Sequence, residues 1–171
     1  MKEIQLLSLL CIAEAAVLSD VWKGKIPNAI TATGIVCALA YQLAENGCAG
    51  VLLWMGGAVL PALLFCGFYY FRMIGAGDVK LLCALGGFLG PSDCLECIAV
   101  SVLSGGILSL LIMLRCRSLS RRLAYFAEYI STYSRELKWR PYLEQTPQEA
   151  RFCFSVPVLL GTIYYIAGGL I

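Results

Sequence analysis

Two aspartates in this sequence lie at the boundaries of apolar stretches, where their carboxyl groups could act as catalytic acid and base. Asp20 closes the first apolar stretch, and Asp78 opens a later one within the segment Gly-Ala-Gly-Asp-Val-Lys at 75–80. Ionisable side chains at the edge of a hydrocarbon layer are costly unless they pair or face a hydrated cavity. Two aspartates at matched depth therefore predict a functional site. Two carboxyl groups that share one proton can activate a water molecule, one as base and the other as acid.

Other kinds of chemistry find little support. The sequence has no His, which removes the Ser-His and Cys-His nucleophile pairs and every His-ligated metal or haem site. Cys94 and Cys97 have Cys-x-x-Cys spacing, but a zinc site needs about four ligands and no second pair is apparent. We therefore expect no metal and no cofactor. A disulfide between Cys94 and Cys97 is an open alternative to a pair without function.

The composition is that of an integral membrane protein, since 60% of the 171 residues are hydrophobic and only 14% are charged. Helices that cross about 30 Å of hydrocarbon need about 20 apolar residues. Six stretches meet or approach this length, at 4–19, 28–44, 49–70, 79–89, 95–114 and 152–171. They predict an all-α membrane protein of one domain, 1–171, built as a bundle of about six transmembrane helices. The stretch 79–89 is short and could be a partial crossing buried in protein.

The distribution of charge predicts the orientation. Twelve of the 13 basic residues fall in alternate connections between these stretches, namely the first, third and fifth. The positive-inside bias then puts these connections in the cytoplasm and both termini outside. Asp20 and Asp78 would both lie near the cytoplasmic face. The formal net charge of +2 is too small to indicate nucleic-acid binding.

The fifth connection, 115–151, is the only long polar segment and carries eight basic residues. Apolar residues recur within it at spacings of three and four between charged ones, the pattern of an amphipathic helix. We expect this basic loop to lie on the cytoplasmic membrane surface as a connector. A role in docking a substrate is the alternative.

Five residues near the aspartates are candidates for supporting roles. Gly75 and Gly77 would let the backbone bend sharply and approach a bound strand. Lys80 lies two positions after Asp78, so on a helix the two side chains point apart, and Lys80 is expected to reach headgroups or substrate. Asn28 follows Pro27 and is expected to cap the second helix.

Glu14 lies six residues before Asp20, about 9 Å deeper in the membrane. A carboxyl group at that depth would need a hydrogen-bonding partner. We expect Glu14 to be a structural group in the bundle interior, with contact to substrate or to the two aspartates as the alternative.

The segments around Asp20 and Asp78 also resemble motifs of known protease families. The segment 75–78 resembles the Gly-x-Gly-Asp motif of intramembrane aspartyl proteases, and Asp20 to Asn28 resembles the first-aspartate segment of bacterial type IV prepilin peptidases. The segment 154–161 is similar to the Pro-containing final span of that family. The chain thus resembles a prepilin peptidase of the short form, which lacks the N-terminal methyltransferase region, so N-methylation is not expected.

The resemblance implies an aspartic endopeptidase with Asp20 and Asp78 as catalytic residues and no metal. Its substrates would be precursors of type IV pilus or protein-secretion systems. These pilin-like proteins carry a short basic leader before an apolar helix, and the leader would be removed at the cytoplasmic face of the bacterial inner membrane. The lipid bilayer is the other expected partner. Which aspartate is the base, and how many copies of the chain associate, stay open.

Three alternatives remain. A preflagellin peptidase has the same chemistry and differs in substrate. A small channel or transporter could use the two aspartates for ions or protons, but such a site is expected near the bilayer midplane rather than at one face. An inactive scaffold of a secretion or pilus machine would have no need of both aspartates.

Overall fold

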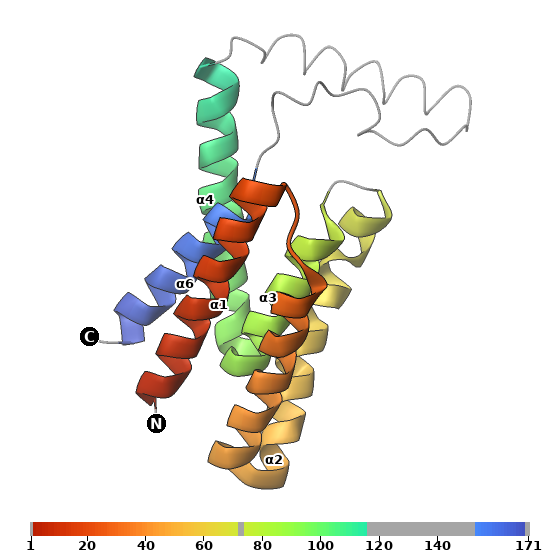
Figure 1. The fold of residues 1–171 in the computed structure, drawn as a ribbon, viewed down its shortest axis with the longest axis vertical. Coiled ribbons are helices and arrows are strands. Elements are labelled where there is room, and N and C mark those ends of the chain that lie inside the picture. The colour runs from red at the N-terminus through yellow and green to blue at the C-terminus, as the bar shows by residue number, and fades with distance from the viewer. Residues whose placement is uncertain (1, 72–73, 116–152, 170–171) are drawn as a thin grey trace.

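The structure, a computed structural model, describes residues 2–71, 74–115 and 153–169. Every regular element in these ranges is a helix, and they contain no strand (Figure 1). In chain order the helices are α1 (Lys2–Lys23), α2 (Asn28–Tyr70), α3 (Ala76–Leu89), α4 (Pro91–Arg115) and α6 (Ser155–Gly169). The prediction of an all-helical protein is confirmed for these residues. The amphipathic helix and basic loop predicted within 115–151 lie outside them, apart from Arg115.

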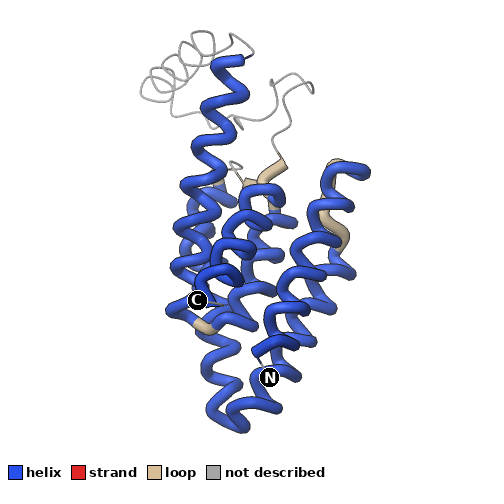
Figure 2. Tube along the Cα trace, turned by 90° about the vertical axis from the view of Figure 1, so that its left-hand side faces the viewer, coloured by secondary structure: helices blue, strands red, loops and turns tan. Residues whose placement is uncertain are grey.

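The second and third predicted stretches form a single helical hairpin, α2. At Gly47 the backbone leaves the helical region, with φ 56° and ψ −139°, a combination that glycine adopts without a steric penalty. The chain reverses there, and the arms 28–46 and 48–70 run side by side (Figures 1 and 2). The Trp54 indole N–H donates to the Ile35 carbonyl at 3.1 Å and ties one arm to the other.

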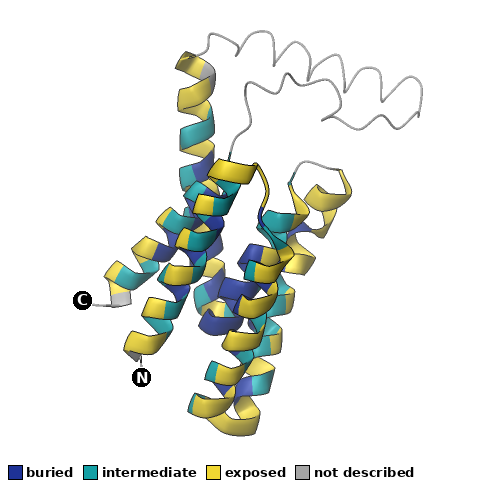
Figure 3. Ribbon diagram, viewed as in Figure 1, coloured by how far each residue is buried: buried dark blue, intermediate teal, exposed yellow. Residues whose placement is uncertain are grey.

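The length and the apolar surface of the helices are typical of a membrane protein. Within the residues that the structure describes, three helical segments are long and apolar enough to cross a bilayer, namely Glu3–Lys23, Asn28–Tyr70 and Pro91–Ile112. Large apolar side chains cover the outside of the bundle; Leu52 and Leu63 are each 73% exposed (Figure 3). Such a surface is unfavourable in water and suits lipid. The number of six crossings stays a prediction.

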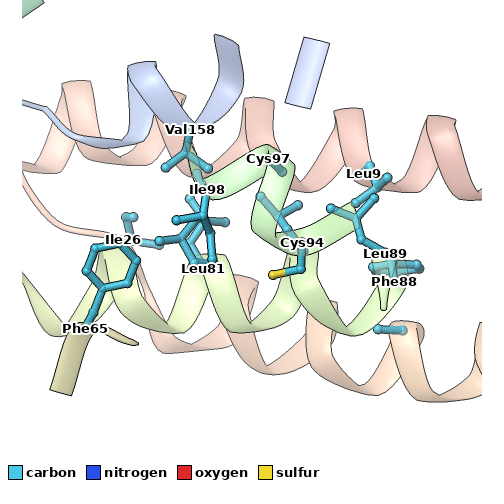
Figure 4. Close-up of a cluster of buried hydrophobic side chains, with 14 residues drawn as sticks. Leu9, Ile26, Phe65, Leu81, Phe88, Leu89, Cys94, Cys97, Ile98 and Val158 are labelled. Atoms are coloured by element: carbon cyan, nitrogen blue, oxygen red, sulfur yellow. The ribbon is translucent and has the colours of Figure 1, made fainter. Parts of the chain in front are cut away.

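Helix α3 is short and lies in the middle of the bundle. Its 14 residues extend about 21 Å at about 1.5 Å per residue, less than the about 30 Å of hydrocarbon. It contacts α1, α2 and α4, and its residues 84–89 are all buried. Its apolar side chains Leu81 and Phe88 form the core together with Leu9 of α1 and Ile98 of α4 (Figure 4).

The C-terminal end of α3 is inside protein, and polar side chains from two other helices satisfy its free carbonyls. Gln5 of α1 donates to the Phe88 carbonyl at 2.8 Å, and Gln42 of α2 donates to the same oxygen at 3.0 Å. Carbonyls at a helix end have no partner within the helix, and in an apolar medium each unsatisfied one costs several kcal/mol. Gln5 and Gln42 therefore allow α3 to end inside the bundle.

The helices pack in two groups, and the site lies where the groups meet. Helix α3 packs mainly on α2, while α6 packs on α4 and α1. At one end of the bundle the end of α1 and the starts of α3 and α6 come together. Ser155 of α6 contacts Asp20 of α1, and Gly77 of α3 lies against Ile26 in the connection between α1 and α2. These three helix ends bring Asp20 and Asp78 into one region.

Candidate active site

Asp20 is held in place by the way α1 ends. Gly24 adopts φ 63°, the left-handed conformation common just after a helix, and its N–H donates to the Asp20 carbonyl at 2.8 Å. This glycine ends α1 one turn after the aspartate. The half-buried Asp20 carboxylate accepts a 2.6 Å hydrogen bond from the hydroxyl of Ser155. The end of α1 therefore fixes the backbone of Asp20, and α6 fixes its side chain.

Asp78 lies in the first turn of α3, three residues after the N-cap Gly75. Glycine supplies space here rather than an unusual conformation. Gly75 has an extended backbone (φ −71°, ψ 144°), which any residue can adopt, so its conformation does not require glycine. A Cβ at Gly75 would lie 3.1 Å from Asp78 Oδ2, and a Cβ at Gly77 would lie 3.2 Å from the Cβ of Ile26. Any side chain would crowd the carboxylate or push α3 away from the connection after Asp20.

The two carboxyl groups interact electrostatically. The pKa of Asp78, which lies outside the three candidate spans, is raised to about 6, chiefly by burial and further by the negative charge of Asp20. A hydrogen bond from the Gly75 backbone acts in the opposite direction and lowers the pKa. Burial and a neighbouring like charge both favour the protonated acid. Asp78 can therefore keep a proton in weakly acidic solution, which suits the acid of a water-activating pair.

Lys80 and Asn28 bind each other on the exposed side of this region. The Lys80 ammonium donates to Asn28 Oδ1 at 2.9 Å, which joins α3 to the start of α2. The expectation that Asn28 caps α2 is wrong. Pro27 is the N-cap, and no side chain makes a capping bond there. Proline has no N–H and its φ of −62° suits the start of a helix.

Glu14 is not part of this cluster. The expected position in the bundle interior is wrong, because Glu14 is exposed on the outside of α1. The buried face of α1 contains Leu9, Ala13 and Ala16, at spacings of four and three. Asp20 follows Ala16 by four residues and therefore lies on the same face of the helix. Glu14 directly follows Ala13, so its side chain points away from that face.

Cys94 and Cys97 do not form the disulfide considered as an alternative. Both thiols are free and buried at the start of α4. The Cys94 thiol lies 3.7 Å from the Gly57 carbonyl and donates to it, a contact between α4 and α2. The pair acts as small packing residues in the core.

Among the described residues, Ser155 makes a hydrogen bond to Asp20 that the sequence did not indicate. It is completely buried, and its hydroxyl bonds to a residue 135 positions earlier in the chain. In the sequence, Ser155 stands out only as a polar residue two positions before Pro157, at the start of an otherwise apolar helix. This pattern gives little indication of a role at the site. Only the packing of α6 on α1 connects Ser155 to Asp20.

The chain gives no match among curated proteins or among solved structures. A family model described as the type IV leader peptidase family matches residues 6–110. This range includes both Asp20 and Asp78 and covers more than half of the 171 residues. It confirms the resemblance that the two aspartate segments carry. With its two interacting aspartates at one end of an apolar helical bundle, this chain belongs to the type IV leader peptidase family and is a membrane peptidase.

Proposed function

We propose that this protein is an aspartic endopeptidase that removes the short basic leader from type IV pilin-like precursors, with Asp20 and Asp78 as its catalytic residues. The observation that carries the proposal is the interaction of these two carboxyl groups within the matched range of a leader peptidase family. Both lie at the same end of the bundle rather than at its middle, which favours hydrolysis at a membrane face over ion transport.

The proposed reaction needs only the dyad and water. The ionised aspartate takes a proton from water, whose oxygen attacks the carbonyl carbon of the scissile bond, while the protonated aspartate gives its proton to the carbonyl oxygen. The tetrahedral intermediate then collapses. The first aspartate transfers its proton to the leaving nitrogen as the C–N bond breaks, and the second recovers a proton from a hydroxyl of the intermediate. The dyad returns to its starting state with no covalent enzyme intermediate.

The expected position of the scissile bond relative to the dyad follows from the distribution of basic residues. We propose six crossings in one domain, with both termini outside and the dyad at the cytoplasmic face of the bacterial inner membrane. A basic leader is retained in the cytoplasm by the same positive-inside bias, so the bond after it would lie level with Asp20 and Asp78. Gly75 and Gly77 would support the dyad by leaving space around Asp78. The Lys80–Asn28 bond, together with Pro27 before it, would fix α3 against the start of α2.

The direct test is co-expression with pilin-like precursors from the same genome. We expect precursors to be shortened when this chain is present, and mass spectrometry of the product should place its new N-terminus between the basic leader and the apolar helix. Cells without the chain give the background. Cleavage of flagellin precursors alone would identify the preflagellin alternative. If no precursor of either kind is cleaved by well-expressed protein, the peptidase proposal for this chain is wrong.

Cleavage should depend on pH in a direction set by Asp78. A pKa raised to about 6 means that Asp78 holds its proton below that pH and loses it above. Because the reaction needs a singly protonated dyad, we expect the rate of precursor cleavage by the protein in lipid nanodiscs to fall as the pH rises through about 6. Thermal unfolding measured over the same range would show that the fold persists. A rate that stays constant from about pH 5 to about pH 8 would contradict the role of this proton.

A further inference from the structure

The hydroxyl of Ser155 is placed to make the two aspartates unequal. It lies 2.6 Å from Asp20 Oδ2 and donates to it, and Ser155 itself has no exposed surface. A hydroxyl that donates to a carboxylate oxygen stabilises the ionised form, and the effect is larger where water is excluded. Ser155 is also the first residue of the 15-residue helix α6, whose N-terminal end carries partial positive charge. Both features favour a negative charge on Asp20.

Asp78 has a different environment. It lies in the first turn of its own helix, and a backbone hydrogen bond from Gly75 favours its ionised form, but burial and the charge of Asp20 outweigh that bond. The described part of α6 has no charged side chain that could compensate. Among the residues that the structure describes, the other charged groups near these helix ends are Lys23, Lys25, Lys80 and Arg115. Of these, Lys80 is engaged with Asn28.

We propose that Ser155 is a positioning residue that keeps Asp20 ionised, so that Asp20 is the base that deprotonates water and Asp78 is the acid that protonates the scissile carbonyl. This assignment rests on the proposed function for its catalytic part. The location of the shared proton can be measured without any turnover.

The kinetic test compares Ser155→Ala with Ser155→Thr, which keeps the hydroxyl. Loss of a hydrogen bond to a charged group should lower kcat about 10- to 100-fold with little change in KM, and should move the acidic limb of the pH profile upward by about one unit. Ser155→Thr should recover most of kcat. Ser101→Ala is the matched control, since Ser101 is equally buried and donates to the Cys97 carbonyl at 2.6 Å, away from the dyad. It should leave kcat and the profile unchanged.

The second test is infrared spectroscopy of the protein in lipid bilayers, which detects the C=O band of a protonated carboxyl group. As the pH is lowered, this band should appear at a higher pH in Asp20→Asn, where Asp78 alone remains, than in Asp78→Asn, where Asp20 alone remains. In Asp78→Asn, where Asp20 alone remains, adding Ser155→Ala should raise the pH at which a band appears by about one unit or more.

The outcomes separate the two proposals. If the wild type cleaves precursors but Ser155→Ala keeps its kcat and pH profile, or the band appears at the higher pH in Asp78→Asn instead, the role of Ser155 is overturned while the peptidase stands. If Ser155→Ala and Ser101→Ala lose activity and thermal stability in parallel, Ser155 is merely structural. If the bands behave as expected but no precursor is cleaved, the proton assignment stands and the proposed function is wrong.

Discussion

Asp20→Asn and Asp78→Asn should each lower precursor cleavage by about 10³-fold or more, because a general acid or base in such a site contributes about 10²–10⁴-fold and neither aspartate can replace the other. Asparagine has nearly the shape of aspartate but cannot take up a proton from water or donate one to the carbonyl. The two residues act as a unit, so the double variant should be no less active than the worse single variant. The measurement is kcat on a purified precursor in lipid nanodiscs.

The control for this prediction is Asp93→Asn. Asp93 is the acidic residue in the first turn of α4, and it accepts a 2.7 Å hydrogen bond from Tyr165, away from the dyad. Its substitution removes a partly buried carboxylate in the same bundle but should leave kcat unchanged.

Asp78→Asn should also fold at least as well as the wild type, since it removes a carboxyl group whose charged form is disfavoured by burial and by Asp20. Cleavage that survives in either single dyad variant would remove that aspartate from the mechanism.

The sequence was informative about the helices and the aspartates because the underlying rules are local. Apolar length predicts helices in a membrane, where every backbone polar group must be satisfied within the segment. All six predicted stretches contain helix in the structure, and the short one, 79–89, is buried in α3 as its length suggested. Asp20 and Asp78 stood out because a charge beside an apolar run is costly.

The partners of these residues could not be predicted in the same way. The hydrogen bonds from Gln5 and Gln42 to the end of α3, and from Ser155 to Asp20, join positions that are far apart in the chain. No local rule relates such positions. Only the packing of the helices against one another brings them within hydrogen-bonding distance.

The orientation of each helix about its own axis was also hard to predict. In a soluble helix the apolar stripe marks the buried face, but lipid is as apolar as the core, so a membrane helix can be apolar all round. The expected interior position of Glu14 failed for this reason. In α1 the buried face is marked instead by the small residues Ala13 and Ala16, which allow close approach of other helices.

Because small residues set how closely two helices can approach, Gly86→Ala should cause a large loss of stability. Helices α2 and α3 meet at Gly57 and Gly86, where a Cβ at Gly86 would lie 2.2 Å from the Gly57 carbonyl oxygen and 2.7 Å from the Cys94 sulfur. The oxygen belongs to the backbone of a helix and cannot rotate away, so the two helices must separate. Overpacking of this kind costs about 1–3 kcal/mol, which corresponds to a lower melting temperature by about 2–12 °C for a chain of this size.

Gly106→Ala separates this steric effect from the ordinary preference of helices for alanine. Gly106 lies in α4, and a Cβ there would meet nothing within 4 Å, so its substitution should be neutral or stabilising by up to about 1 kcal/mol. Melting of the two variants in the same detergent is the measurement, and equal melting temperatures would show that α2 and α3 are not in backbone contact at Gly86. Because α3 also carries Asp78, separation of the helices should reduce cleavage in Gly86→Ala even below its melting temperature, since a shift of about 1 Å can cost about 10²-fold in rate.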